Sequence, residues 1–228
     1  MSERESILAR VREALTVPSP LPGHEAGGTH PAPGLQRVHN ARQWLPLVGE
    51  TFQDRVALFE KNAVELRAGF HLVSTRDELC KLLTKLRDAE AWKKVGLHGG
   101  EMTDEVSRVL ELPACRTDQG YDVNEMEGCD AGITECDALV AQTGSVLVTS
   151  RSAGGRALSV LPPHHVVLAR REQLVSDLPE AFALLKRKYG QNYPSFISLI
   201  TGPSRTGDIE RILVLGAHGP KKLSILCL

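Results

Sequence analysis

The residues with the clearest chemical potential follow the apolar run at residues 196–200. The chain there turns into Thr201-Gly202-Pro203-Ser204-Arg205-Thr206-Gly207-Asp208, which is rich in hydroxyl groups and carries one guanidinium. A strand that ends in such a segment exposes hydrogen-bond donors at the edge of its sheet. Arg205 suits a carboxylate or phosphate, which it binds through two parallel hydrogen bonds. We therefore expect an anion-binding loop at the carboxyl end of a buried strand, with Gly202, Pro203, Ser204, Arg205 and Thr206 as candidate ligand contacts.

The same loop also has a purely structural interpretation. Ser204 or Thr206 would cap a short helix that follows, while Arg205 pairs with Asp208 or Glu210. Asp208 argues against a phosphate, because a carboxylate in the first turn of that helix repels it. Both interpretations stay open on these residues alone.

A second polar turn follows the apolar run at residues 138–141. Thr143, Gly144 and Ser145 offer backbone donors and two hydroxyl groups, and they would face the first loop if the two strands are neighbours. A tight hairpin turn with no ligand is an equal alternative. The basic, glycine-rich segment at residues 150–156 lacks the spacing of a nucleotide-binding loop.

Three sites carry histidines with possible chemical roles. His164 and His165 begin a predicted strand, so their side chains point to opposite faces and only one of them enters a given site; we take His164 as the candidate ligand contact. His218 lies between glycines in a turn, where a general base, a metal ligand or a structural role are all open. We name His218 and Glu135 as candidate bases. His98, which follows another strand, has the same open roles as His218.

Composition narrows the classes of partner. The 27 basic and 28 acidic residues nearly cancel, which does not favour a nucleic acid or an anionic membrane surface. No apolar run reaches the roughly 18 residues of a membrane span, and the first residues lack the apolar core of a signal peptide, so we expect a cytoplasmic protein. There is no G-x-S-x-G elbow and no H-E-x-x-H helix, which leaves hydrolase chemistry with little support.

The five cysteines indicate neither a disulfide framework nor a metal cluster. Their number is odd and no C-x-x-C pair occurs. We interpret them as small buried apolar residues. The close pair Cys129 and Cys136 could share a metal, but no third or fourth ligand lies nearby in the sequence. The sequence therefore predicts no cofactor and no bound metal.

The first half of the chain predicts alternating helices and strands. Residues 3–15 show the spacing of an amphipathic helix, and the Pro- and Gly-rich residues 16–34 predict a linker, so we separate residues 1–34 from an α/β domain at 35–228. A helix at 48–66, closed by Gly69, precedes strands at 70–73 and 94–97. A helix capped by Ser74 or Thr75 follows the first strand, and a helix that starts near Thr103 follows the second. This order is typical of a parallel sheet with helical crossovers.

The second half predicts further strands and one helix. The helix covers residues 177–189. The strands are expected at residues 138–141, 145–149, 160–168 with an interruption at Pro162-Pro163, 196–200 as a central strand, 212–215 and 223–228.

Four blocks in order resemble the LUD-domain family of lactate utilization protein C, from about Gly49 to the end. They are residues 133–145, Leu161-Pro162-Pro163-His164-His165, residues 200–210 and Val214-Leu215-Gly216-Ala217-His218-Gly219-Pro220. The resemblance implies a fold similar to ribose-phosphate isomerases and CoA transferases, with an open, mainly parallel sheet and flanking helices. It also implies a bacterial system that oxidises L-lactate to pyruvate with iron–sulfur partner subunits.

Three hypotheses of function remain. The first is a component of a lactate-oxidising system that holds a small anionic metabolite between Arg205, Ser204 and the turn at residues 143–145. The second is a stand-alone enzyme on a phosphosugar or CoA ester, with His218 or Glu135 as base; Gln142 stands where related sequences often carry an acidic residue, and an amide cannot act as nucleophile or base. The third is a non-catalytic scaffold subunit. A homo-oligomer is compatible with all three.

Overall fold

The computed structural model describes residues 3–16, 45–207 and 213–228. Contacts divide the chain into two units, Met1–Trp44 and Leu45–Leu228. In the first unit, α1 (Glu3–Thr16) confirms the predicted N-terminal helix. The predicted linker beyond residue 16 and the predicted domain boundary lie outside the described residues. None of the described helices combines the length and apolar content that a membrane span needs.

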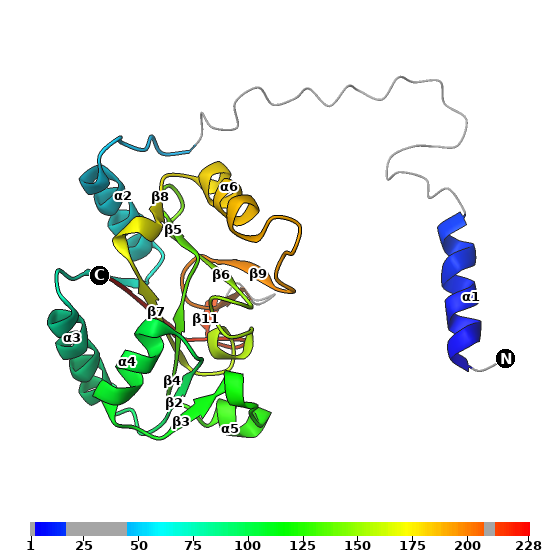
Figure 1. The fold of residues 1–228 in the computed structure, drawn as a ribbon, viewed down its shortest axis with the longest axis horizontal. Coiled ribbons are helices and arrows are strands. Elements are labelled where there is room, and N and C mark those ends of the chain that lie inside the picture. Colours follow the sequence, from blue (N-terminus) through cyan, green and yellow to red (C-terminus); the bar gives the residue numbers. More distant parts are fainter. Residues whose placement is uncertain (1–2, 17–44, 208–212) are drawn as a thin grey trace. The chain divides into compact units, whose positions relative to one another are not determined.

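The second unit is built on a six-stranded parallel sheet (Figure 1). Its strand order is β1 (Gly69–Leu72), β12 (Lys222–Cys227), β7 (His164–Ala169), β4 (Ala131–Glu135), β2 (Val95–Leu97) and β3 (Ala114–Arg116). Each neighbouring pair is parallel. The predicted open, mainly parallel α/β sheet is therefore confirmed.

Helices and a second sheet cover the two faces of this sheet. Alternate residues of β7 divide between them: Val166 and Leu168 join the apolar cluster of α3 (Arg76–Ala89) and α4 (Glu101–Leu110), whereas Val167 joins that of α2 (Phe52–Glu65). The short α5 (Val123–Glu127) follows β3. Both faces of the central strands are thus buried, as their nearly continuous apolar sequences require.

The second sheet has four strands in the order β8 (Leu174–Val175), β5 (Ala138–Val140), β6 (Ser145–Thr149) and β9 (Ile197–Ile200). The hairpin of β5 and β6 is antiparallel, as predicted, and α6 (Leu178–Tyr189) packs on this sheet. The prediction of a central strand at residues 196–200 was wrong. Among the described strands, β9 pairs with β6 alone, so it lies at the edge of the sheet, and its side chains are half-exposed.

Three further local predictions were wrong. Gly69 does not close α2 but begins β1; Arg67 takes the left-handed position instead, with φ 64°. Residues 160–163 form no strand, because the chain leaves the 3-10 turn η3 (Ala157–Ser159) and enters β7 only at His164. Instead of a helix capped by Ser204 or Thr206, β10 (Arg205–Gly207) pairs antiparallel with β11 (Leu213–Leu215).

Candidate functional site

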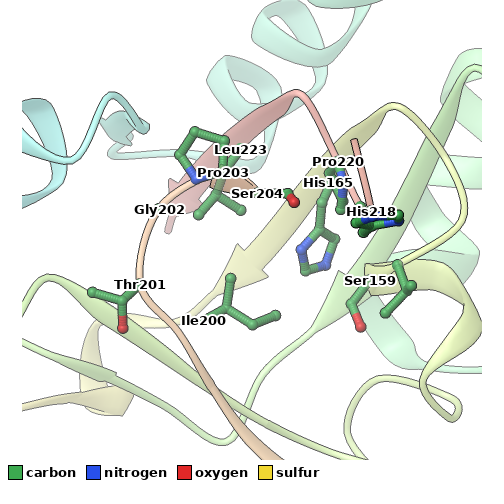
Figure 2. A pocket seen from close by; sticks show the side chains of 12 residues that line it. Ser159, His165, Ile200, Thr201, Gly202, Pro203, Ser204, His218, Pro220 and Leu223 are labelled. Atoms are coloured by element: carbon green, nitrogen blue, oxygen red, sulfur yellow. The ribbon is translucent and has the colours of Figure 1, made fainter. Parts of the chain in front are cut away.

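A cavity of about 220 Å³ lies at the carboxyl end of β9, beside the first residues of β7 and β12 (Figure 2). It is lined by the loop after β9, the turn before β12, η3 and the start of β7. Its lining residues are Ser159, Val160, His165, Ile200, Thr201, Gly202, Pro203, Ser204, His218, Gly219, Pro220 and Leu223. Three of the five candidate contacts in the first loop, Gly202, Pro203 and Ser204, are therefore brought together with the candidate base His218.

Backbone contacts hold the loop after β9 in place. Gly202 has φ 87°, and a Cβ there would come within 2.8 Å of the carbonyl oxygen of Leu66, at the end of α2. Only glycine combines that conformation with that close approach. The Ser204 amide donates to the carbonyl oxygen of Pro220 at 2.9 Å, and the Ser204 carbonyl accepts from the Gly216 amide at 2.9 Å. These bonds join the loop to the turn that carries His218.

The two loops predicted from sequence also meet. Because β6 and β9 are neighbours, Ser145 and Thr201 lie side by side, and their hydroxyl oxygens are 2.8 Å apart. Gly144, with φ 63°, packs against Asn62 of α2. The Asn62 side chain donates to the carbonyl oxygens of Ala141 and Gln142 at 2.9 and 3.0 Å. This turn supports the cavity through Thr201 and does not line it.

A glycine in the central sheet brings Ser159 to the cavity. A Cβ on Gly132 in β4 would overlap the backbone carbonyl of Leu158 in η3. The bare backbone of Gly132 therefore lets η3 lie directly on the sheet, and Ser159 follows at the cavity wall. Its hydroxyl donates to the carbonyl oxygen of Arg156 at 3.1 Å.

His165 is the most deeply buried polar residue that lines the cavity, with only 1% of its surface exposed. Its Nε2 lies 2.9 Å from the hydroxyl oxygen of Thr134 in β4. Its Nδ1 is buried and has no hydrogen-bond partner among the described residues. Burial lowers the pKa of His165 from 6.5 to about 3, so the ring is neutral. Figure 2 shows the ring among Ser159, Ile200 and His218. A neutral imidazole with one unused nitrogen suits a hydroxyl or carbonyl group of a ligand.

His164, the histidine preferred from the sequence, lies on the opposite face of β7 and does not line this cavity. Its Nε2 is 2.9 Å from the Ser224 hydroxyl oxygen, and its ring packs edge-on against Trp92. Burial lowers its pKa from 6.5 to about 4. It contributes instead to a separate hollow of about 150 Å³ beside Lys222.

The exposed His218 connects the cavity to a wider one. A second cavity of about 540 Å³ shares Val160, His218 and Gly219 with the first, and Lys221 lies at its wall. His218 therefore contacts both spaces, and a ligand group in either one reaches it.

A family model matches most of the residues that form the fold and the cavity. The model of the LUD domain matches residues 56–228, which include every strand of both larger sheets and all residues that line the cavity. The chain belongs to the LUD domain family. Its resemblance to that family, expected from four short blocks, is confirmed.

Named relatives of this LUD domain share parts of its length. Lactate utilization protein C from Bacillus licheniformis is 31% identical over 142 residues, 60% of this chain and 58% of that protein. The protein of the same name from Halalkalibacterium halodurans is 37% identical over 100 residues, 43% of this chain and 44% of that protein. The matched segments thus span about half the length of these relatives.

One solved structure shares the fold of the LUD domain. A DUF162 family protein from Deinococcus radiodurans superposes with a TM-score of 0.62 at 20% sequence identity. The match covers 78% of this chain and 99% of that one. It supports the α/β architecture and carries no statement about ligands.

Other candidate residues of the LUD domain lie outside the cavity. The Arg205 side chain folds back and donates to the carbonyl oxygen of Leu66, so its guanidinium is exposed beside the end of α2. Thr206 lies in β10, opposite Val214. The Thr143 hydroxyl oxygen is buried and has no partner among the described residues.

Glu135, the second candidate base, lies at the start of α4. Because the N-cap residue Gly100 has no side chain, the Glu135 carboxylate takes its place and accepts from the Met102 amide at 2.9 Å. Its other oxygen is 3.9 Å from the Arg170 guanidinium. His98 accepts from the Glu135 amide at 3.2 Å. This group therefore stabilises a helix end, where a carboxylate is favourable, and does not line the cavity.

Four of the cysteines are buried, as predicted, and Cys80 is half-buried. Burial raises the pKa of Cys129 and of Cys227 to about 11. Within residues 3–16, 45–207 and 213–228, no three His, Cys, Asp or Glu side chains gather as a metal-binding cluster.

Sequence reasoning missed His165, Thr134 and Ser159. The only local signal for His165 was the His-His pair itself, which shows that the two rings take opposite faces but not which face holds the cavity. Thr134 sits within an apolar strand, where a threonine is ordinary. Ser159 reaches the site only because of Gly132, a contact between distant segments.

Proposed function

We propose that this LUD domain chain is a subunit of a system that oxidises L-lactate to pyruvate, and that the cavity at His165 binds a small anionic metabolite of that reaction. The names of the relatives support the first part. The observation that carries the second is the buried, unpartnered Nδ1 of His165. A buried polar atom without a partner costs free energy unless a ligand or water satisfies it.

The size of the cavity favours a small metabolite. A volume of about 220 Å³ equals that of roughly seven water molecules. Pockets for drug-sized ligands start near 300 Å³, so a short hydroxy acid or oxo acid fits and a coenzyme does not.

The polarity of the cavity suits an anion. Among the described residues, no Asp or Glu side chain lines it, so a carboxylate meets no like charge there. Ser204 and His218 supply polar side chains on the wall beside the Gly219 backbone. We propose Ser204 and His218 as the contacts of the ligand carboxylate and His165 as the contact of its neighbouring oxygen.

Electrons released by lactate must reach an acceptor. The sequence contains neither the glycine-rich spacing of a dinucleotide site nor closely spaced cysteines for a cluster. We therefore propose iron–sulfur partner subunits as the acceptor. Affinity purification of the full chain from cells grown on lactate should recover partners with bound iron and sulfide. Lactate oxidation by the isolated chain would contradict a need for partners.

Calorimetric titration tests the metabolite site. L-lactate and pyruvate should bind the full chain, whereas inorganic phosphate and a CoA ester should bind weakly. Ser204→Ala and His218→Ala should each weaken lactate binding about tenfold, the loss of one hydrogen bond to a charged group. Ser74→Ala is the matched control, since Ser74 is exposed and does not line the cavity. Equal binding by all variants would place the ligand elsewhere.

The wider cavity supports a second candidate, a stand-alone enzyme on a phosphosugar or CoA ester. Its volume of about 540 Å³ holds a larger ligand, and Lys221 at its wall suits a phosphate. Under this alternative, Lys221→Ala weakens binding of the phosphorylated ligand and leaves lactate unaffected. The titration above therefore separates the two candidates.

A further inference from the structure

We propose that His165 recognises both a 2-hydroxy acid and the corresponding 2-oxo acid by changing its tautomer, and that Thr134 is the positioning residue that completes either tautomer. This inference rests on the proposed function, because it assigns the ligand class of the same cavity. It adds that the reduced and oxidised forms of one metabolite bind in one place.

The contact between Thr134 and His165 leaves the tautomer undetermined. The two side chains are 0% and 1% exposed, and 2.9 Å separates the hydroxyl oxygen from Nε2. A hydroxyl group both donates and accepts, so it satisfies Nε2 with or without a hydrogen. A carbonyl or carboxylate at this place would accept only, and it would fix the hydrogen on Nε2.

His98 in the same chain shows the fixed alternative. The Glu135 amide donates to its Nε2 at 3.2 Å, which requires a nitrogen without hydrogen, and its Nδ1 lies 3.0 Å from the carbonyl oxygen of Gly99. Backbone groups therefore set one tautomer at His98. His165 has a hydroxyl on one nitrogen and no partner among the described residues on the other.

A 2-oxo acid requires a hydrogen on Nδ1, because its carbonyl group only accepts. The hydroxyl group of a 2-hydroxy acid can act with either tautomer, and we assign it the role of donor. The hydroxyl group of a 2-hydroxy acid donates to Nδ1, and the hydrogen of the ring then lies on Nε2 and is donated to Thr134. The carbonyl group of a 2-oxo acid accepts from a hydrogen on Nδ1, and Thr134 then donates to Nε2. The ring carries one hydrogen in both complexes, so the exchange neither consumes nor releases a proton.

Burial keeps the ring in the neutral form that this exchange needs. The other histidine at the cavity, His218, is exposed, and His164 lies on the opposite face of β7. No Asp or Glu side chain among the described lining residues would stabilise an imidazolium at His165. A positively charged ring carries a hydrogen on both nitrogens and accepts no hydrogen bond, so it could not change its tautomer between the two ligands.

Nuclear magnetic resonance of the full chain with ¹⁵N-labelled histidine tests this inference directly. A spectrum that correlates ring nitrogens with ring hydrogens distinguishes a nitrogen that carries a hydrogen from one that does not. Saturating L-lactate should place the hydrogen of His165 on Nε2, and saturating pyruvate should place it on Nδ1. The same tautomer in both complexes, or a doubly protonated ring in either, would overturn the proposal.

Variants of Thr134 separate positioning from packing. Thr134→Val keeps the shape and removes the hydroxyl, and it should weaken both ligands about fivefold to tenfold. Thr134→Ser should restore both affinities and the tautomer change, which a packing role would not. The signals that are missing from the spectrum of His165→Phe are those of His165. If that variant does not fold, the signals that Thr134→Val shifts identify His165.

The outcomes also separate this inference from the proposed function. If neither acid binds, both proposals fail. If both acids bind and shift the His165 signals without a change of tautomer, the metabolite site stands and the exchange is wrong. If both bind and the His165 signals do not move, the exchange is wrong and the ligand lies elsewhere.

Discussion

The backbone carbonyl of Leu158 occupies the space that a Cβ atom would take on Gly132. This contact places η3 directly on β4 and so determines where Ser159 lines the cavity. Gly132→Ala should lower the free energy of unfolding by about 1–3 kcal/mol, because the backbone of η3 must move away. Urea denaturation measures this loss, and lactate titration should show weaker binding.

Gly69→Ala is the control for that prediction. Gly69 lies in the same sheet, but a Cβ there would meet its neighbours at 3.6 Å or more, an ordinary van der Waals distance. The free energy of unfolding of this variant should lie within about 0.5 kcal/mol of that of the unmodified chain. A similar loss in both variants would show that the close approach of η3 has no special energetic role.

Arg67 adopts a left-handed conformation at the end of α2. The Arg67 amide donates to Val64 and the Ala68 amide to Ala63, at 2.9 and 2.8 Å, a Schellman pattern in which glycine is the usual residue. Arg67→Gly should raise the free energy of unfolding by about 0.5–1 kcal/mol, because it removes the strain of the side chain at φ 64°. Arg67→Ala removes the charge but keeps a Cβ atom and hence the strain. If this variant were stabilised as much as Arg67→Gly, relief of strain would not be the cause.

Asp137 is a buried carboxylate held by two donors on α6. Lys188 Nζ and Tyr189 Oη lie 2.6 and 2.7 Å from its Oδ1. Burial opposes ionisation, yet the hydrogen bonds keep the pKa of Asp137 below its usual value. Lys188→Ala leaves this charge without its cation and should cost about 1–3 kcal/mol in thermal or urea unfolding. Arg187 is an exposed neighbour of Lys188, and Arg187→Ala should lower the free energy of unfolding by no more than about 0.5 kcal/mol. Equal losses in the two variants would contradict a stabilising ion pair between Lys188 and Asp137.

The two buried histidines predict a loss of stability in mild acid. The pKa values are lowered from 6.5 to about 4 for His164 and to about 3 for His165. At a pH between 6.5 and these lowered values, the unfolded chain binds protons that the folded chain does not. The free energy of unfolding therefore falls as the pH drops below about 6.5. The slope approaches about 1.4 kcal/mol per pH unit for each histidine. Urea unfolding at pH 7 and pH 5 measures it.

A variant identifies the source of this pH dependence. His164→Gln keeps a polar group near Ser224 but cannot take up a proton, and it should reduce the slope. An unaltered slope in His164→Gln would assign the acid sensitivity to other groups.

Local patterns predicted most elements of the fold. Thr75, one of the two caps expected for α3, accepts from a backbone amide of the first turn. Asp177, expected as the first residue of its helix, caps α6 in the same way. Gly144 takes the positive φ that the hairpin turn needs. Capping and turn chemistry depend on residues that lie within a few positions of each other, so the sequence contains all the information they require.

The candidate site was only partly predictable. The sequence named the loop at residues 201–204 and His218 separately as candidates, and the structure brings them to one cavity. Arg205 was expected to face the ligand, but its side chain contacts Leu66, a residue far away in the sequence. The predicted helix at this place is β10, because pairing with β11 satisfies its backbone.

The sequence by itself indicated the family, through the resemblance of four short blocks, and the parallel α/β architecture, through periodicity and capping. The loop after β9 became a candidate through its local composition. The tertiary structure alone decided that β9 lies at a sheet edge and that His165, not His164, meets the cavity. Strand order and the choice of face come from packing between distant segments. Two neighbouring residues of a strand always point to opposite faces of the sheet. Only the packed fold determines which elements cover each face.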